Sequence, residues 1–327
     1  MAGMDSGSRG LGAGCALHPA QQATGTCARC GNFMCDACGA YGTQTFCPTC
    51  RERTGVSAFP LGRDTWSFSA LWDYCFEAFK REWVMLSLAL VVTIAVSMVA
   101  NLFGSIGTAI FQGGDSLVPL ILAMILAYLV QVAVQGVMGM GMMRVVFDVL
   151  EGGRADVGRV FSQVHKVGRY VLATLIAVVV VSLPLMILFC VLSFVGLVAV
   201  GVPVSDMLAG GAALREQLPA LLGVLGGAFL LTFIPAIYFG LPLYLLQAEL
   251  TSNEDVTAVR AFRNCYVLAR GERLSLFGFS LLAILLVLVG LMACFVGVIP
   301  ATALMQLLLG GLYLALRNGS ELDTRPR

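Results

Sequence analysis

Long stretches without a charged residue dominate the pattern of polar and apolar positions along this chain. Five such stretches cover residues 83–114, 116–143, 170–205, 217–248 and 274–316. A helix needs about 20 predominantly apolar residues to cross a bilayer, at a rise of about 1.5 Å per residue. Each of the first four stretches therefore predicts one membrane-spanning helix.

The last charge-free stretch is too long for one span. As a single straight helix its 43 residues would measure about 64 Å, twice the hydrocarbon thickness. We expect it to fold back at 297–300, where Gly297 and Pro300 favour a turn, which gives six spans in all. Kinks are expected in the third and fourth spans at Pro184, Pro235 and Pro242.

Basic residues fall almost entirely on one side of the expected spans. The side that carries both termini holds fifteen of them, whereas the other side holds only Arg215. The fifteen are Arg63, Lys80, Arg81, Arg144, Arg154, Arg159, Lys166, Arg169, Arg260, Arg263, Arg270, Arg273, Arg317, Arg325 and Arg327. Because cytoplasmic loops of membrane proteins are enriched in Lys and Arg, we expect both termini in the cytoplasm.

Three basic segments each contain an amphipathic stretch just before a span, and such helices lie in the membrane interface. The expected apolar faces hold Phe68, Leu71, Trp72, Cys75, Phe76 and Phe79 in the first stretch, Val157, Val160, Phe161 and Val164 in the second, and Val256, Val259, Phe262 and Tyr266 in the third. The expected polar faces hold Asp73, Glu77, Lys80 and Arg81, then Arg159, Gln163 and Lys166, then Arg260, Arg263 and Arg270.

The three stretches also align with one another without gaps. Trp72, Phe76 and Lys80 match Phe161, His165 and Arg169, and they match Phe262, Tyr266 and Arg270. The match indicates either three copies of an interface helix plus a two-span hairpin, or only the aromatic and basic residues that any interface helix carries.

Composition narrows the class of protein. The chain has 327 residues, of which 58% are hydrophobic and 12% are charged, whereas soluble domains carry about 25% charged residues. This excludes a disordered chain, a coiled coil or a secreted disulfide scaffold for most of its length. The net charge of +1 gives no sign of a nucleic-acid partner. A strong preference for Arg over Lys favours a bacterial source, and hence the inner membrane.

Potential metal ligands cluster near the N-terminus in four pairs, each with two intervening residues: Cys15 and His18, Cys27 and Cys30, Cys35 and Cys38, Cys47 and Cys50. That spacing lets one tight turn aim both ligands at the same metal, and zinc favours thiolate and imidazole. Eight ligands suffice for two closed tetrahedral zinc sites, whose metal would supply the folding energy of a segment too short for a core. Disulfides, or one zinc ion with unused thiols, are the alternatives, and a cytoplasmic location disfavours disulfides.

This run of ligands resembles a B-box-type zinc finger over residues 15–53. The resemblance implies a cross-braced arrangement, with Cys15, His18, Cys35 and Cys38 on one zinc ion and Cys27, Cys30, Cys47 and Cys50 on the other. Members of that family often end in histidines, whereas the last pair here is Cys47-Pro48-Thr49-Cys50, so the pairing of ligands stays open. The resemblance also implies a protein–protein interaction module.

The finger carries too little positive charge to predict nucleic-acid binding. Its basic residues Arg29, Arg51 and Arg53 stand against Asp36 and Glu52, whereas a nucleic-acid footprint needs a basic stripe with stacking aromatic residues. We therefore expect no nucleic-acid partner, and a cytoplasmic protein partner instead.

The membrane part resembles the six-span domain associated with glycerophosphodiester phosphodiesterases, through segments 68–80, 238–244 and 255–264. The catalytic barrel of those enzymes has no counterpart here, so no such activity is implied. Walker, HExxH and GxSxG motifs are also absent from the sequence. Of the two histidines, His18 is assigned to zinc and His165 to the headgroup level, so we expect no enzymatic activity.

A few small and polar residues inside the spans remain. Gln131 and Gln135, with Asn101, predict either hydrogen bonds between helices or the lining of a pathway. Close helix packing, rather than soft-metal binding, is expected where Met138, Met140, Met142 and Met143 alternate with Gly136, Gly139 and Gly141, and again at Gly223 and Gly227.

The sequence thus predicts a mainly α-helical protein with five parts: a disordered tail at 1–14, a two-zinc module at 15–53, a linker at 54–63, a six-span membrane domain at 64–317 and a cytoplasmic tail at 318–327. We expect a membrane-anchored adaptor, in contact with lipid, that recruits a cytoplasmic protein. The alternative is a transporter or channel for small molecules or lipids, regulated by the zinc module.

Overall fold

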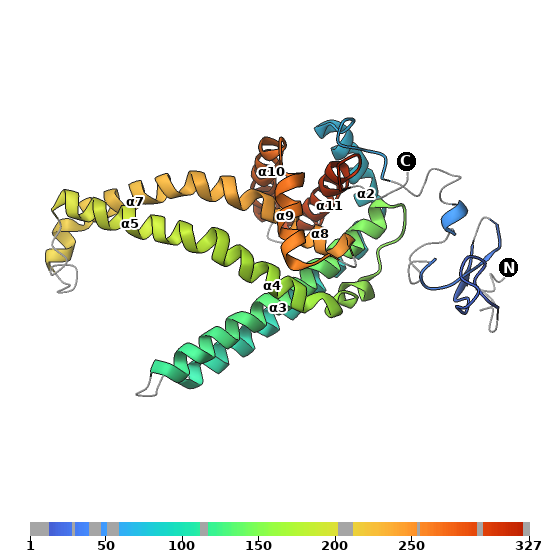
Figure 1. Cartoon of the computed structure of the whole chain (residues 1–327), viewed down its shortest axis with the longest axis horizontal. Helices are drawn as coiled ribbons and strands as arrows, with labels where there is room; N and C mark the ends of the chain where they lie inside the picture. The colour runs from blue at the N-terminus through green and yellow to red at the C-terminus, as the bar shows by residue number, and fades with distance from the viewer. Residues whose placement is uncertain are drawn as a thin grey trace.

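The computed structural model describes residues 13–27, 30–38, 47–50, 59–111, 117–201, 212–253, 256–292 and 297–322. Within them the chain forms a small β-hairpin near the N-terminus, followed by a helical bundle (Figure 1). Outside the described residues lie 1–12 of the expected tail at 1–14, 51–53 of the expected zinc module, 54–58 of the expected linker at 54–63 and 323–327 of the expected cytoplasmic tail. The packed bundle begins upstream of residue 64, because Phe59 is buried in its core.

Six helical segments in the described residues are long and apolar enough to cross a membrane, as the charge-free stretches predict. The first two are α2 (Phe68–Phe111) and α3 (Leu117–Leu150). The third runs through α4 (Val167–Ala177), the π-helix η3 (Val178–Ser182) and α5 (Leu183–Val200). The fourth runs through α7 (Ala212–Gly240), the 3-10 helix η4 (Leu241–Leu245) and α8 (Leu246–Ser252). The last two are α10 (Arg273–Met292) and α11 (Val298–Arg317).

The spans pair as three hairpins. Helix α2 packs along α3, α5 along α7, and α10 along α11, while α11 also packs against α2. The hairpins α2–α3 and α5–α7 diverge from each other as they run away from the region where the three hairpins meet (Figure 1). The buried core lies where all three hairpins meet, and α11 is its centre, with Leu307, Tyr313 and Leu316 fully buried.

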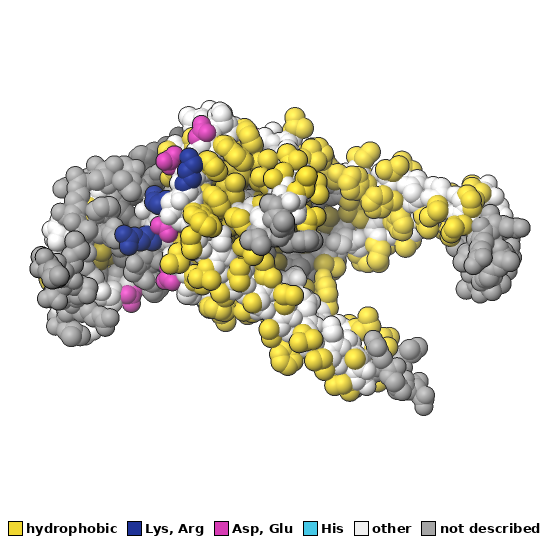
Figure 2. Space-filling model, turned by 180° about the vertical axis from the view of Figure 1, so that it is seen from behind, with side chains coloured by type: hydrophobic (Ala, Val, Ile, Leu, Met, Phe, Trp, Pro, Cys, Tyr) yellow, Lys and Arg dark blue, Asp and Glu magenta, His cyan; other side chains and the backbone are white. Residues whose placement is uncertain are grey.

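Apolar side chains cover the outer faces of the helices (Figure 2). In the first five spans no more than 17% of the most apolar window is buried within the protein. An apolar surface of this extent is incompatible with water and is satisfied by lipid. The fold is therefore that of a multi-pass membrane protein.

Basic and acidic side chains gather together at one end of the bundle (Figure 2). We call it the basic end, because the helix ends predicted to carry the basic residues lie there. Hydrogen bonds join the helix ends there: Arg81 Nη2 at the start of the first span donates to Val149 O near the end of α3, at 3.2 Å. Arg317 Nη2 at the end of α11 donates to Asn253 Oδ1 just after α8, at 2.6 Å. Alternate helix ends therefore meet on one side, as antiparallel hairpins require.

The prolines mark breaks in helical geometry. Pro184 follows a π-helical turn at Val178–Ser182, and Pro242 begins the 3-10 turn of η4. Proline lacks an N–H and its ring displaces the carbonyl of the preceding turn, which favours such altered turns. Pro235 lies within α7, whose helix continues past it.

The predicted position of the last turn is wrong by a few residues. Helix α10 ends at Met292 and α11 already begins at Val298, so Pro300 lies in the first turn of α11. A proline is tolerated there because the first N–H groups of a helix have no intrahelical partner.

The second amphipathic stretch differs most from expectation. It forms two short 3-10 helices, η1 (Val157–Phe161) and η2 (Val164–Lys166), rather than an α-helix. Phe161 and Val164, assigned to the apolar face, are exposed, whereas the expected polar residues Arg159, Gln163 and Lys166 are buried. For the two cations the cause is physical, since Arg159 is attracted by the buried carboxylate of Asp148 and Lys166 by carbonyl groups at the end of α8.

The third stretch forms α9 (Ala258–Leu268), an amphipathic helix as predicted. Small residues rather than the expected aliphatic ones make its protein-facing side: Ala258, Ala261 and Cys265 are buried, whereas Val259 is 63% exposed. The helix therefore presents a small-residue face to the bundle and a bulkier one to its surroundings.

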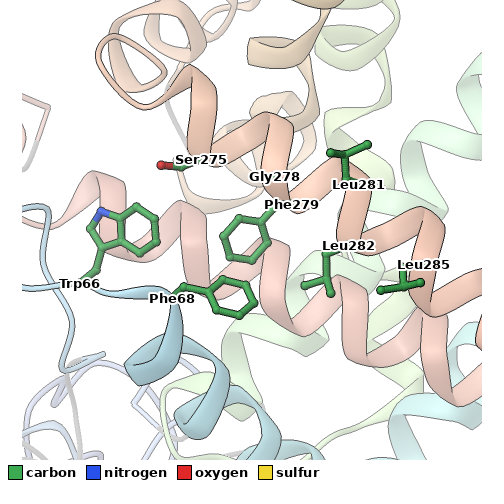
Figure 3. A pocket seen from close by; sticks show the side chains of 8 residues that line it. All are labelled: Trp66, Phe68, Ser275, Gly278, Phe279, Leu281, Leu282 and Leu285. Carbon is green, nitrogen blue, oxygen red and sulfur yellow. The ribbon is translucent and has the colours of Figure 1, made fainter.

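The first stretch is continuous with α2 and also has two apolar sides. Leu71 and Cys75 are fully buried. Trp72 stacks between Phe68 and Phe76, with centroids 6.2 and 6.0 Å away. Phe68 contacts Phe279 of α10, and both line a groove that Trp66 also lines (Figure 3). The three stretches that precede the hairpins therefore have different conformations, although their sequences align.

Glycines of α3 allow the close packing that the sequence predicts. A Cβ at Gly136 would overlap Tyr170, one at Gly139 would overlap Gln247, and one at Gly141 would overlap the backbone carbonyl of Val160. The prediction of close packing at Gly223 and Gly227 is wrong, because both face open space. Gly196 of α5 makes the close approach to α7 instead.

Candidate metal centre

A β-hairpin brings the N-terminal ligands together. Strands β1 (Gly25–Thr26) and β2 (Phe33–Met34) pair antiparallel, with Gly25 opposite Met34. The tight turn between them places Cys27 and Cys30 together, and Gly31 follows with φ of 72°. Only glycine adopts this left-handed conformation without strain, which explains a glycine directly after the ligand pair.

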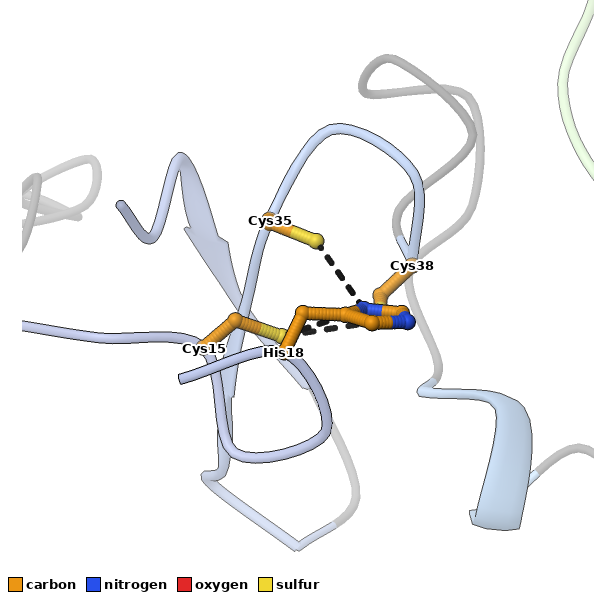
Figure 4. A group of neighbouring side chains, drawn as sticks. All are labelled: Cys15, His18, Cys35 and Cys38. Carbon is orange, nitrogen blue, oxygen red and sulfur yellow. Dashed lines mark hydrogen bonds between the residues drawn. The ribbon is translucent and has the colours of Figure 1, made fainter. Parts of the chain in front are cut away.

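The first ligand group consists of Cys15, His18, Cys35 and Cys38, whose ligand atoms all lie within 4.8 Å of one another (Figure 4). His18 Nδ1 lies 3.4 Å from Cys35 Sγ and 3.2 Å from Cys38 Sγ. Cys15 Sγ lies 3.5 Å from Cys38 Sγ. Zinc–sulfur bonds of about 2.3 Å in a tetrahedron separate sulfur atoms by about 3.8 Å, so the group is close to the size of a metal shell.

The second group consists of Cys27, Cys30, Cys47 and Cys50, again within 4.8 Å of one another. Cys30 Sγ lies 3.7 Å from Cys47 Sγ. Backbone amides point at the thiols, since Cys47 N donates to Cys27 Sγ at 3.1 Å and Cys50 N to Cys47 Sγ at 3.4 Å. Such donors stabilise thiolates and orient metal ligands from outside the shell.

The two groups alternate along the sequence, with the first and third ligand pairs in one and the second and fourth in the other. This is the cross-braced grouping that the B-box resemblance implies, and the final Cys-Pro-Thr-Cys pair does not alter it. All seven cysteines are free, so the described residues contain no disulfide among them.

Electrostatics favours a cation in each group. Burial raises the pKa of Cys38 to about 12, and its neighbours Cys15 and Cys35 add to the effect. Burial and neighbouring thiols also raise the pKa of Cys50 to about 12. Burial opposes ionisation of Cys15 too, but backbone hydrogen bonds outweigh it and lower the pKa of Cys15 to about 6. Several thiolates coexist in so small a space only when a metal ion replaces their protons.

The donor chemistry fits two metal ions of the zinc type. Three thiols with one imidazole, and four thiols, are both closed tetrahedral sets with no position left for water or substrate. Six of the seven cysteine ligands are buried, and together with Met34 they form the core of the module. Metal bound here would therefore hold the module together rather than catalyse a reaction.

Comparisons with protein-family models, with curated proteins and with solved structures give no match for this chain. The class of the protein accordingly rests on its own geometry: a multi-pass helical membrane protein with two four-ligand Cys/His groups near its N-terminus.

The polar residues predicted inside the spans do not form one site. Gln135 is exposed on the surface of α3, whereas the amide of Gln131 is buried without a hydrogen bond among the described residues. Asn101 is exposed on α2, and His165 is exposed on η2. The two glutamines therefore share neither a helix–helix hydrogen bond nor a cavity wall.

Sequence reasoning missed a buried polar cluster at the basic end. Glu249 accepts hydrogen bonds from Asn253 Nδ2 and Asn264 Nδ2, each at 2.8 Å, and from Tyr313 Oη at 2.7 Å. Arg317 continues the cluster by donating to Tyr313 Oη at 3.0 Å. These bonds tie α8, α9 and α11 together. The only sequence signal is that Glu249 directly follows a charge-free stretch.

Proposed function

We propose that this chain is a membrane-anchored zinc-module adaptor, without catalytic activity, that recruits a cytoplasmic protein to the bacterial inner membrane. The observation that carries the proposal is the pair of closed ligand groups, which offer metal-stabilised structure and no reactive coordination position. A module of this kind contributes a surface rather than a reaction.

The surface we assign to partner binding consists of Leu17 and Phe33, hereafter the Leu17–Phe33 patch. Leu17 is 47% exposed and Phe33 is 40% exposed, so both large apolar side chains face outward from the module. Their backbones are adjacent, because Ala16 N donates to Phe33 O at 3.0 Å. Apolar side chains held outward by a metal-fixed backbone are typical anchors of protein–protein contacts.

The expected topology agrees with a cytoplasmic partner. The six spans leave both termini on one side, and the fifteen basic residues of the positive-inside argument belong to that side. The chain is held to the bundle from Phe59 onward: Asn318 at the end of α11 donates to Phe59 O at 3.2 Å and to Leu61 O at 3.1 Å.

Capture of partners by the full-length protein in native membranes tests the proposal. Tagged wild-type protein, the patch variant Leu17→Ser/Phe33→Ser and the ligand variant Cys27→Ser/Cys30→Ser are crosslinked in cells and purified under identical conditions. We expect one or more cytoplasmic proteins to be enriched by wild type and lost from both variants.

Gln22→Ser is the matched control, because Gln22 is exposed on the same module and its strand contact uses only the backbone. The control should retain the partner. Identical protein sets from wild type and both variants would overturn the adaptor proposal.

A further inference from the structure

A large cavity opens between the second and third hairpins. It has a volume of about 910 Å³, in the range of ligand-binding pockets. Its walls come from α7 with η4 and α8 on one side and from α10 with α11 on the other, and most of the lining is apolar. Representative lining residues are Phe233, Tyr244, Phe277, Ile284 and Leu309.

Polar groups nevertheless face this cavity at the depth of the spans. Gln247 and Tyr170 share one wall, where Gln247 Nε2 donates to Tyr170 Oη at 3.4 Å, and Gln306 of α11 lines the opposite wall. The absence of side chains at Gly136 and Gly139 makes room for Tyr170 and Gln247. Amides inside a membrane protein are costly unless they find partners, so these walls suit a ligand that has polar as well as apolar groups.

Arg273 lies beside the same cavity, next to residues that line it. It precedes the lining residue Phe277 by one helical turn, and its guanidinium lies over the ring of Tyr238, 3.7 Å from the centroid. Tyr238 in turn lies two residues before Gly240, which also lines the cavity. Nη1 of Arg273 is buried and forms no hydrogen bond within the part of the chain that the structure describes. A buried guanidinium nitrogen without an acceptor is the group that a phosphate would satisfy.

The distance along α10 from Arg273 to the last lining residue, Ile284, matches one leaflet of a bilayer. Eleven residues separate Arg273 from Ile284 on α10, which corresponds to about 16 Å at 1.5 Å per residue. Half of a hydrocarbon core of about 30 Å is nearly the same distance. A cation at the interface and an apolar channel that ends near mid-membrane together have the shape and polarity of a phospholipid.

We propose that this cavity binds a glycerophospholipid from the leaflet at the basic end, with the phosphate on Arg273 and an acyl chain along α10. The glycerol esters then lie at the level where Tyr170 and Gln247 offer hydrogen bonds. The site is independent of the zinc module and of the adaptor role.

A second groove offers a comparison for the role of Arg273 beside the larger cavity. It has a volume of about 440 Å³, is lined by Trp66, Phe68, Ser275 and Phe279 among others, and runs along another side of α10 (Figure 3). No charged side chain lines it. An acyl chain of any neighbouring lipid fits such a groove. The larger cavity is not lined by a charged side chain either, but Arg273 lies over Tyr238 of α7, the helix that forms one of its walls.

Lipid binding to the full-length, delipidated protein in detergent tests the proposal by native mass spectrometry. Phosphatidylglycerol and diacylglycerol with identical acyl chains are titrated separately, since only the first carries a phosphate. We expect wild-type protein to bind phosphatidylglycerol about tenfold more tightly than diacylglycerol, as one charged hydrogen-bonded contact would give. Equal affinities would overturn the proposal and indicate nonspecific apolar filling.

Two variants locate the site. Arg273→Gln should weaken phosphatidylglycerol binding about tenfold and leave diacylglycerol binding unchanged, which also shows that the cavity is still folded. Ile284→Trp should weaken both lipids, because it fills the inner end of the channel. If Arg273→Gln does not fold, the two-lipid comparison in wild type and Ile284→Trp decide the question.

Matched controls exist for both variants. Arg270→Gln removes an exposed charge three residues away, and Leu288→Trp adds the same bulk one turn beyond the lining residue Ile284. Both should bind both lipids like wild type. Full retention of phosphatidylglycerol by Arg273→Gln, or equal losses in the controls, would contradict the assignment.

Discussion

Lys166 illustrates how a single side chain fixes a helix end in this protein. It is 1% exposed, and its Nζ donates to Leu250 O at 3.0 Å, to Thr251 O at 3.2 Å and to Asn253 O at 3.4 Å. These carbonyls end α8, where the helix dipole concentrates partial negative charge. A buried ammonium is acceptable here because three acceptors replace its water.

Replacing this lysine should destabilise the bundle. Lys166→Met keeps most of the side-chain length but leaves the carbonyls at the end of α8 without a donor, at a cost of about 2 kcal/mol. We expect a lower thermal midpoint in detergent. Lys80→Met is the control, since Lys80 is exposed and its Nζ lies over the Phe76 ring, 4.7 Å from the centroid. Equal midpoints for the two variants would refute the capping role.

At the same scale, the metal ligands were predictable and the buried charges were not. Paired cysteines such as Cys27 and Cys30 can be recognised in the sequence, because a spacing of two residues lets one tight turn aim both thiols at the same metal ion. Arg159 and Asp148, whose Nε and Oδ2 lie 3.1 Å apart, sit on segments that meet only in the folded chain. Periodicity placed Arg159 on a solvent face because it carries no information about such distant partners.

Single elements of the bundle are positioned by backbone approaches as well as by side chains. At Gly141 the carbonyl of Val160 comes so close to α3 that a Cβ has no room. The 3-10 helix η1 therefore packs against α3 through its backbone at Val160, whose side chain is also buried.

Gly141→Ala should therefore destabilise the protein by more than about 1 kcal/mol, because either α3 or η1 must move. Gly223→Ala is the counterpart, since Gly223 faces open space within α7 and alanine is the better helix former. We expect a lower thermal midpoint for the first variant and an unchanged or higher one for the second. The reverse order would show that the close approach at Gly141 is not maintained.

The spans were easier to predict from the sequence than the exact residues at which the helices end. Absence of charge predicted the first four spans, since a charge within hydrocarbon is expensive, and the length of the fifth charge-free stretch predicted the last two. It did not predict the end of α10 at Met292, because an apolar turn and an apolar helix have the same composition. Two of the three prolines at which kinks are expected, Pro184 and Pro242, lie next to or within altered helical turns, because the effect of proline on the backbone is local.

On the scale of the whole molecule, two separate cores stand out in the described residues. One consists of Met34 and the ligand cysteines of the module, and the other is the helical core that begins with Phe59. The two share no residue. They should therefore lose structure independently, and each should respond to a different treatment.

Removal of metal by a strong chelator should unfold the module and spare the bundle. Without metal the residues around Cys15–Cys50 have no apolar core to keep them folded. We expect rapid proteolysis at the N-terminus and a resistant fragment that begins close to Phe59, with unchanged helical circular dichroism. Simultaneous loss of the bundle, or no change in proteolysis, would contradict the independence of the two cores.

The zinc content of the intact protein shows whether the two ligand groups are two separate closed metal sites. Native mass spectrometry of the wild-type chain should show two zinc ions. Cys27→Ser/Cys30→Ser and Cys35→Ser/Cys38→Ser should each retain one, because each double substitution disables only one ligand group. Cys190→Ser, an exposed cysteine of α5, should retain both. A wild-type chain without zinc, or loss of both ions from a single-group variant, would contradict two separate closed sites.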